Sequence, residues 1–247
     1  MSFSVEERLA IMSVVAAAST GLQLIIGTGA ASLTDAITLT RAAFDLGADA
    51  VMIAPPFFYR KAPLEGLVAF YSEVFAQGVP GGGTVLLYHY PPVTGVPISF
   101  DLLHQLQDRF PTQLAGIKDS SGDGEHLRAL CREFPNLLVF VGNDSLLADA
   151  LSVGGVGAIT ALANVMPKKL RAIYDAHERG EAAQEIQAEL SRAKERLSDF
   201  PTVPAVKALL VAQRALPNDY VRPPLCPLGS EDRARLLASF SSELAPE

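Results

Sequence analysis

Tryptophan is absent from the sequence, and cysteine and histidine are scarce. The two cysteines, Cys131 and Cys226, lie far apart and lack the spacing of a zinc site, so we expect two free thiols in a reducing compartment. The histidines show neither an HExxH motif nor any other paired spacing; they are His89, His104, His126 and His177. No structural metal is therefore expected.

Basic clusters and long apolar runs are also missing. The net charge is −7 without any long run of Lys and Arg, which argues against nucleic acid and anionic membranes as partners. The most apolar early stretch, residues 11–33, is interrupted by Ser, Thr and Gly, and it predicts a helix followed by a strand instead of a membrane span. Glu6 and Glu7 stand where a signal peptide needs positive charge. We therefore expect a cytoplasmic protein that binds neither nucleic acid nor membrane.

Six short, nearly all-apolar segments alternate with helical segments about every 25 to 30 residues. The apolar segments are residues 22–29, 49–56, 84–91, 114–120, 137–144 and 156–162. The first helix is expected over residues 5–19, where Ser4 and Glu7 form a capping box, and the second opens at Thr34 and Asp35. This alternation is typical of βαβ units whose parallel sheet is buried on both faces. The sequence therefore predicts an α/β fold.

Two architectures fit this pattern, a doubly wound open sheet and a (β/α)₈ TIM barrel. The sequence has no GxGxxG and no GxxxxGK[ST] motif, which weakens the nucleotide-binding open sheet. A closed barrel would need two further strands and their linking helix, roughly 50 residues. We therefore expect a barrel that lacks its first two strands and first helix over residues 1–163, followed by a C-terminal helical extension over residues 164–247. An open sheet remains the alternative.

The most informative residue is Lys118, which lies near the end of the apolar segment 114–120. Burial disfavours a charged amine and can lower a lysine pKa from about 10.4 toward neutrality, as a Schiff-base lysine requires. A lysine at the edge of the core whose amine reaches solvent is the alternative interpretation of this residue alone.

Tyr88 provides a partner for Lys118. Each is the fifth residue of its predicted strand, and consecutive strands of βαβ units are neighbours, so the two should stand side by side near the carboxyl ends. Active sites of parallel α/β folds are built at those ends. A tyrosine hydroxyl beside an amine can transfer protons during imine formation, whereas Tyr88 alone could equally be a core residue.

Other predicted strand ends carry small, polar or aromatic residues. Glycine and polar residues end three of them, at residues 27–29, 142–144 and 157–160, where backbone N–H groups could approach a carboxylate or simply form a turn. Residues 55–59, which include Phe58, could form the wall of a pocket or a structural aromatic cluster.

Over nearly its whole length the sequence resembles the dihydrodipicolinate synthase and N-acetylneuraminate lyase family of class I aldolases. The motifs that carry the resemblance are GTG, GADAVMIAPPFFY, LLYHYPPVTG, GIKDSSGD, VGND, GGVGAITALANVMP and VRPPL. The resemblance implies a TIM barrel with a C-terminal helical extension, assembled as a homodimer or homotetramer, that acts on a small 2-oxo acid without a cofactor. By position it makes Lys118 the Schiff-base lysine and Tyr88 the catalytic tyrosine. It assigns substrate contacts to Gly142, Asn143 and Ile159.

Departures from the family pattern narrow the expected activity. The GTTGE motif, which holds the substrate carboxylate, would precede Met1. Val93 stands where the synthase has an arginine for its second substrate, and Phe58 stands where the synthase has a second tyrosine that is contributed across the dimer interface. These differences make the sequence more similar to 2-keto-3-deoxygluconate and 4-hydroxy-2-oxoglutarate aldolases than to the synthase.

The expected function is therefore a lyase that cleaves a 4-hydroxy-2-oxo acid reversibly to pyruvate, or a related 2-oxo acid, and an aldehyde through a lysine Schiff base. Two alternatives remain open. One is 4-hydroxy-tetrahydrodipicolinate synthase or a dehydratase of 2-oxo sugar acids that uses the same imine. The other is a truncated, non-catalytic barrel subunit.

Overall fold

The computed structural model describes residues 2–244, which divide into two compact units. The first unit spans Phe3–Phe140 and the second begins at Val141. This division does not coincide with the expected boundary between residues 163 and 164. That boundary separates the expected barrel from its C-terminal helical extension, and it stays a prediction. Within residues 2–244, no helix is long and apolar enough to cross a membrane.

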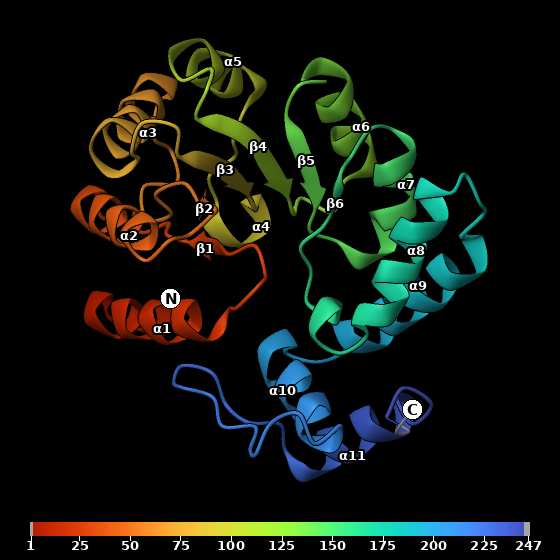
Figure 1. The fold of residues 1–247 in the computed structure, drawn as a ribbon. Helices are drawn as coiled ribbons and strands as arrows, with labels where there is room; N and C mark the ends of the chain where they lie inside the picture. The colour runs from red at the N-terminus through yellow and green to blue at the C-terminus, as the bar shows by residue number, and fades with distance from the viewer. Residues whose placement is uncertain (1, 245–247) are drawn as a thin grey trace. The chain divides into compact units, whose positions relative to one another are not determined.

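The first unit alternates strands and helices, as the sequence predicts. Its strands are β1 (Ile25–Gly27), β2 (Ala50–Ile53), β3 (Thr84–His89), β4 (Leu114–Asp119) and β5 (Leu138–Val141), the last of which ends at the unit boundary. Its helices are α1 (Val5–Ala18), α2 (Leu33–Asp45), α3 (Leu64–Gly78), α4 (Pro91–Thr94), α5 (Phe100–Arg109) and α6 (Gly124–Glu133). The strands neighbour one another in chain order, and β1 to β4 pair in parallel. Figure 1 shows α2, α3 and α5 along the outer face of these strands.

Side-chain caps define where several helices of this unit begin. Ser4 and Glu7 form the predicted capping box of α1, in which each side chain accepts a backbone N–H. The second helix begins one residue earlier than expected, because the N-cap is Ser32, whose hydroxyl accepts the Asp35 N–H. Thr34 and Asp35 therefore lie inside its first turn.

Some strands are shorter than the apolar segments that predict them. β1 covers only three residues, which pair with Ala50, Val51 and Met52, and Leu22 before it is 75% exposed. β3 stops at His89 because Pro91 begins helix α4, and proline has no N–H to donate to a neighbouring strand. An apolar sequence indicates which residues are buried, whereas the length of a strand depends on which residues form backbone hydrogen bonds with a neighbouring strand.

The face of the sheet that the helices of the first unit cover is buried. Val51, Ile53, Val85, Leu87 and Ile117 share this face and have no exposed surface. Gly116 interrupts the apolar run of β4 for a steric reason: a Cβ at this position would overlap the carbonyl oxygen of Leu138 and lie 2.8 Å from the Leu138 Cβ. A register shift between Val85 and Leu86 lies opposite the same part of β4.

The described part of the second unit contains one short strand and is otherwise mostly helical. In chain order its elements are the 3₁₀ helix η1 (Asp144–Leu146), α7 (Leu147–Ser152), β6 (Gly157–Ala158), the 3₁₀ helix η2 (Leu162–Asn164), α8 (Pro167–Glu178), α9 (Gln184–Ser198), α10 (Thr202–Ala212) and α11 (Ser230–Ser239). β6 is much shorter than the predicted strand 156–162, because η2 begins at Leu162. Leu190, Ala193 and Leu197 form the buried stripe of α9. The helical segments expected after residue 164 are thus present.

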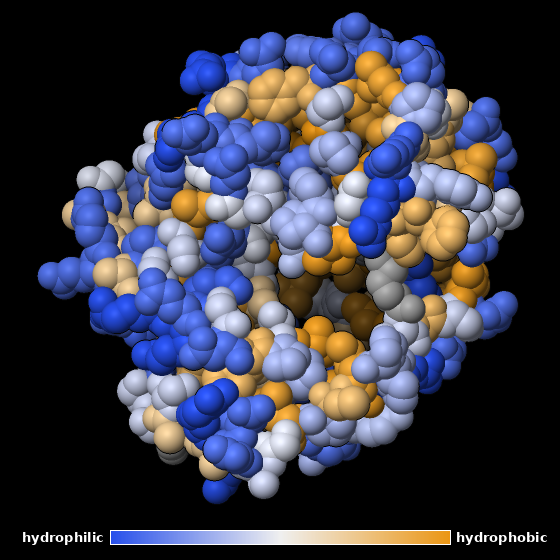
Figure 2. All heavy atoms as spheres, turned by 180° about the vertical axis from the view of Figure 1, so that it is seen from behind, coloured by the Kyte–Doolittle hydropathy of each residue, from blue (hydrophilic) through white to orange (hydrophobic). Residues whose placement is uncertain are grey.

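The space-filling view in Figure 2 shows hydrophilic side chains interspersed with smaller apolar areas on the face it presents. The mixture agrees with a composition in which 19% of residues are charged and 49% are hydrophobic.

Replacement of Gly116 by alanine should lower the free energy of unfolding by about 1–3 kcal/mol, because the new methyl group must displace the backbone of β5. Urea denaturation of the purified protein measures the change. Gly81→Ala is the matched control: a Cβ at Gly81 has no neighbour within 4 Å, so its effect should stay within about 0.5 kcal/mol. Equal midpoints for the two variants would contradict the steric role of Gly116.

Candidate active site

Tyr88 and Lys118 lie side by side at the carboxyl ends of β3 and β4. They are register partners in the parallel ladder, and the Lys118 Nζ lies 4.1 Å from the centroid of the Tyr88 ring. Lys118 is only 9% exposed, and Tyr88 is half-buried. The predicted adjacency is confirmed, and the amine lies over the face of an aromatic ring within a largely buried environment.

The alternation of side chains along the two strands produces this arrangement. Successive residues of a strand point to opposite faces, so Leu87 and Ile117 point away from Tyr88 and Lys118 and are fully buried among the core residues. His89 and Asp119 follow as the next register pair and share the face of Leu87 and Ile117. One pairing of two strands therefore places an amine and a phenol on one face and a histidine and a carboxylate on the other.

The surroundings of Tyr88 favour its neutral, protonated form. Burial raises the pKa of Tyr88, and a hydrogen bond with the Ser120 side chain partly opposes this shift. The Tyr88 and Tyr90 rings stack with centroids 5.7 Å apart, and burial also raises the pKa of Tyr90. Tyr88 therefore keeps a proton to donate at neutral pH.

The turn after β1 has a structural role within this unit. Thr28 is fully buried, its hydroxyl accepts a hydrogen bond from the Thr40 hydroxyl at 2.8 Å, and its N–H donates to the Met52 carbonyl. Arg8 donates to the carbonyls of Gly27 and Gly29. The backbone of this turn is thus fixed from two sides, in agreement with the turn interpretation of the motif.

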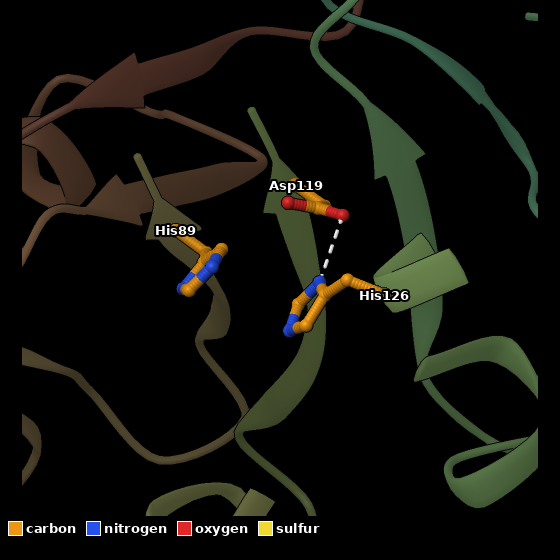
Figure 3. A group of neighbouring side chains, drawn as sticks. All are labelled: His89, Asp119 and His126. Atoms are coloured by element: carbon orange, nitrogen blue, oxygen red, sulfur yellow. Dashed lines mark hydrogen bonds and ion pairs between the residues drawn. The ribbon is translucent and has the colours of Figure 1, made fainter. Parts of the chain in front are cut away.

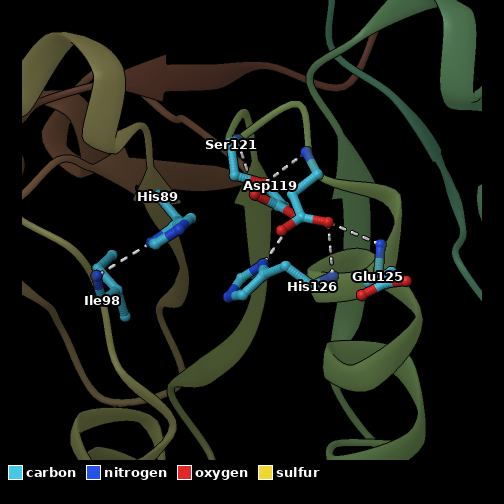
Figure 4. A network of polar contacts seen from close by, with 7 residues as sticks. His89, Ile98, Asp119, Ser121, Glu125 and His126 are labelled. Carbon is cyan, nitrogen blue, oxygen red and sulfur yellow. Dashed lines mark hydrogen bonds and ion pairs between the residues drawn. The ribbon is translucent and has the colours of Figure 1, made fainter.

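A polar cluster of His89, Asp119 and His126 lies at the ends of β3 and β4, on the face opposite Tyr88 and Lys118 (Figure 3). The His126 Nδ1 lies 3.1 Å from the Asp119 Oδ2, and the His89 and His126 rings stack with centroids 4.7 Å apart. His89 Nδ1 accepts the Ile98 N–H at 3.0 Å (Figure 4). No sequence spacing connects the two histidines, because one belongs to β3 and the other to α6.

The donor set of this cluster resembles a metal site, with one ligand atom from each residue within 4.8 Å of the others. The ring geometry argues against metal binding. The lone pairs of imidazole nitrogens lie in the ring plane, and the two planes are stacked at 13° to each other, so their lone pairs run side by side instead of converging on an ion. The Nδ1 atoms of His89 and His126 are also engaged with Ile98 and Asp119. The His126–Asp119 hydrogen bond and the stacking of the two imidazole rings therefore hold the cluster together.

The charges in this network follow from burial and pairing. Burial lowers the pKa of His89 to about 4, so this ring is neutral at pH 7. The hydrogen bond to Asp119 raises the pKa of His126 despite its partial burial. Burial alone would raise the pKa of Asp119, but hydrogen bonds from His126 and Ser121 outweigh it and hold the pKa below its usual value.

The candidate substrate residues Gly142, Asn143 and Ile159 belong to the second unit. Gly142 follows the end of β5, the Asn143 side chain accepts the Ser145 N–H at 3.1 Å, and the Ile159 N–H donates to the Val141 carbonyl at 3.0 Å. They therefore gather around the adjoining ends of β5 and β6. Burial raises the pKa of Asp144, which follows them in this segment.

Phe58 lies in the segment between β2 and α3 of the first unit. Its ring is 76% exposed and contacts Tyr59 edge-on, with centroids 5.3 Å apart. A shallow cavity of about 790 Å³ opens beside it, and neither Lys118 nor Tyr88 contributes to its lining. Its role as a substrate contact stays a prediction.

Comparison with known proteins relates the whole chain to one family. The model of the dihydrodipicolinate synthetase family matches residues 1–242. An uncharacterised DapA-like lyase of Chloroflexus aurantiacus is 41% identical over 244 residues, which cover 99% of this chain and 81% of that protein. A 4-hydroxy-tetrahydrodipicolinate synthase of Thermus thermophilus is 35% identical over 238 residues, which cover 94% of this chain and 78% of that protein.

Solved structures agree with this relation. YagE, a prophage protein of the dihydrodipicolinic acid synthase family from E. coli K12 solved in complex with pyruvate, has a TM-score of 0.91 and 26% identity, with 98% of this chain and 82% of YagE covered. A variant of the Sulfolobus solfataricus 2-keto-3-deoxygluconate aldolase has a TM-score of 0.86 at 24% identity, with 98% and 80% covered. The latter likeness is one of fold alone.

The depressed pKa of His89 should make stability pH-dependent. Its folded-state pKa of about 4 lies below the unfolded value of about 6.5, so the unfolded chain binds the proton more readily. The stabilisation is fully present above pH 6.5 and is lost as the pH falls toward 4, by an amount on the order of 3 kcal/mol. His89→Asn, which can still accept the Ile98 N–H, should lose less stability between pH 7 and pH 4 in urea denaturation. The same loss in both proteins would disprove this assignment.

Proposed function

Because the chain belongs to the dihydrodipicolinate synthetase family, we propose that it is a Schiff-base-forming lyase that cleaves a 4-hydroxy-2-oxo acid reversibly. The observation that carries the proposal is the position of Lys118, a largely buried amine 4.1 Å from the Tyr88 ring at the carboxyl ends of neighbouring parallel strands. Active sites of parallel α/β folds form at this edge.

Imine formation is the first step of the proposed reaction. The neutral amine of Lys118 attacks the C2 carbonyl carbon of the substrate, and the carbonyl oxygen leaves as water after it is protonated. Tyr88 suits the role of proton donor and acceptor because burial keeps its hydroxyl protonated at neutral pH.

Carbon–carbon bond cleavage follows. The protonated imine accepts the electron pair of the C3–C4 bond as that bond breaks, while the C4 hydroxyl loses its proton and leaves as the carbonyl of an aldehyde. The product on the enzyme is an enamine, which gains a proton at C3 and returns to the imine. Hydrolysis then releases the 2-oxo acid and restores the amine of Lys118.

Pyruvate is the proposed common fragment. Support comes from YagE, whose structure was solved in complex with pyruvate. Gly142, Asn143, Ile159 and Phe58 are proposed as substrate contacts by their positions in the family pattern. The Asn143 side chain suits this role because an amide can donate to a carboxylate or a hydroxyl while its oxygen accepts the Ser145 N–H. A homodimer or homotetramer is the proposed assembly.

Condensation of pyruvate with aspartate semialdehyde is the second candidate reaction, favoured by the 35% identity to the Thermus thermophilus synthase. Two residues argue for cleavage instead. Val93 in α4 is 59% exposed and brings no charge to a second carboxylate, and Phe58 brings no hydroxyl. Comparing pyruvate release from several 4-hydroxy-2-oxo acids with consumption of aspartate semialdehyde decides between the two reactions.

Borohydride reduction in the presence of pyruvate should attach one reduced pyruvate to Lys118, because only an imine is reduced to a stable secondary amine. Peptide mass spectrometry locates the adduct. Lys118→Arg should abolish it, since arginine stays charged and cannot form an imine. Lys61→Arg, at an exposed position in the same unit, is the matched control and should label normally. Folded wild-type protein that remains unlabelled would overturn the proposal in favour of a non-catalytic subunit.

Replacement of Tyr88 by phenylalanine should reduce turnover about 10²- to 10⁴-fold, the range expected for loss of a positioned proton-transfer group. The ring that covers Lys118 is retained, so circular dichroism should show the same fold. Steady-state release of pyruvate measures the effect. Tyr90→Phe is the matched control, since its ring stacks on Tyr88 but has no assigned proton transfer. A loss of similar size in both variants would argue against a specific role for Tyr88.

A further inference from the structure

We infer that His126 is a positioning residue for Lys118 and Tyr88, and that it acts from the opposite face of the sheet through Asp119 and the turn that carries Ser120. The inference rests on the proposed function for its kinetic consequence, whereas its structural consequence can be measured without turnover.

The first step is the contact between His126 and Asp119. His126 lies in the first turn of α6, and its Nδ1 is 3.1 Å from the Asp119 Oδ2 (Figure 4). The Asp119 side chain is 3% exposed, so water cannot replace a lost hydrogen bond easily. His126 is itself held by its stacking on His89 and by the Phe100 ring, 5.6 Å away. The imidazole is therefore a fixed donor to a buried carboxylate.

The second step leads from Asp119 into the turn after β4. The other carboxylate oxygen, Oδ1, accepts the Ser121 N–H at 2.9 Å, so Asp119 closes a turn around Ser120. The two oxygens belong to one rigid group, and the donor on Oδ2 therefore sets the direction of Oδ1. The Ser120 N–H donates to the His89 carbonyl at 2.8 Å, which ties the same turn to the end of β3.

The third step reaches the reacting groups. His89, whose carbonyl accepts the Ser120 N–H, directly follows Tyr88 in β3, and the Tyr88 ring lies 4.1 Å from the Lys118 Nζ. Asp119 directly follows Lys118 in β4, so anchoring its side chain also fixes the backbone from which Lys118 projects. A continuous series of contacts thus runs from His126 to both groups of the active site.

Two substitutions of His126 distinguish its role as a hydrogen-bond donor from its role as a stacking ring. His126→Asn keeps an N–H near the position of Nδ1 and removes the aromatic ring. His126→Phe keeps a ring that can stack on His89 and removes the donor. His104→Asn is the matched control, because His104 makes a similar 3.1 Å contact with Glu133 but lies on the exposed side of α5, away from the strand ends.

The kinetic test is the rate of imine formation with pyruvate, trapped by borohydride, together with the kcat and KM for pyruvate release. His126→Phe should lower the trapping rate and kcat about 10- to 100-fold with little change in KM, since misplaced groups slow the chemistry more than they weaken binding. His126→Asn should restore most of the rate, and His104→Asn should match wild type. A wild-type rate in His126→Phe, or equal losses in the Asn and Phe variants, would overturn the inference.

The structural test uses protein labelled with ¹³C at the tyrosine Cζ, with Tyr88→Phe to assign the Tyr88 resonance. His126→Phe should shift this resonance, because the turn after β4, which is tied to the end of β3 through the His89 carbonyl, loses its anchor, whereas the Asn variant and the His104 control should leave it near the wild-type position. An unchanged resonance in His126→Phe would refute the positioning role. If wild-type protein forms no imine, the proposed function fails, and this measurement still decides the role of His126.

Discussion

The in-register parallel pairing of β3 with β4 is the constraint on which the candidate site depends. It places Tyr88 opposite Lys118 and, one residue later, His89 opposite Asp119. Because side chains alternate between the faces of a strand, the first pair and the second pair point in opposite directions. A shift of one residue between these strands would exchange the faces of β4 and separate the amine of Lys118 from the phenol of Tyr88. The proposed reactive pair and the polar cluster on the opposite face are thus two results of one register.

Several buried polar groups near the ends of β1, β3 and β4 are tolerated because they have hydrogen-bond partners. Asp119 accepts hydrogen bonds from His126 and Ser121, His89 accepts from Ile98, and the Thr28 hydroxyl accepts from Thr40. A buried polar group without such a partner costs on the order of 1–3 kcal/mol. Satisfied buried networks also restrict motion, which suits a site whose amine and hydroxyl must hold a common substrate.

The relation to the dihydrodipicolinate synthetase family concerns the fold and the strand-end residues more than the specificity. Lys118 and Tyr88 lie within strands, where packing on both faces restricts change. Val93 and Phe58, where this chain departs from the synthase pattern, are 59% and 76% exposed in connecting segments. Connecting segments tolerate substitution and commonly carry the residues that select a substrate. The proposed imine chemistry with a different second substrate or product agrees with this distribution.

The sequence by itself determined the α/β class, the six strands in chain order and the adjacency of Tyr88 and Lys118, because apolar periodicity and the pairing of consecutive strands are local rules. Only the tertiary structure decided how short β1 and β6 are, since strand length depends on backbone partners, and where Phe58 lies. It also decided the cluster of His89, Asp119 and His126. That cluster forms where α6 packs on the outer face of β3 and β4, and packing between elements distant in sequence leaves no spacing from which it could be predicted.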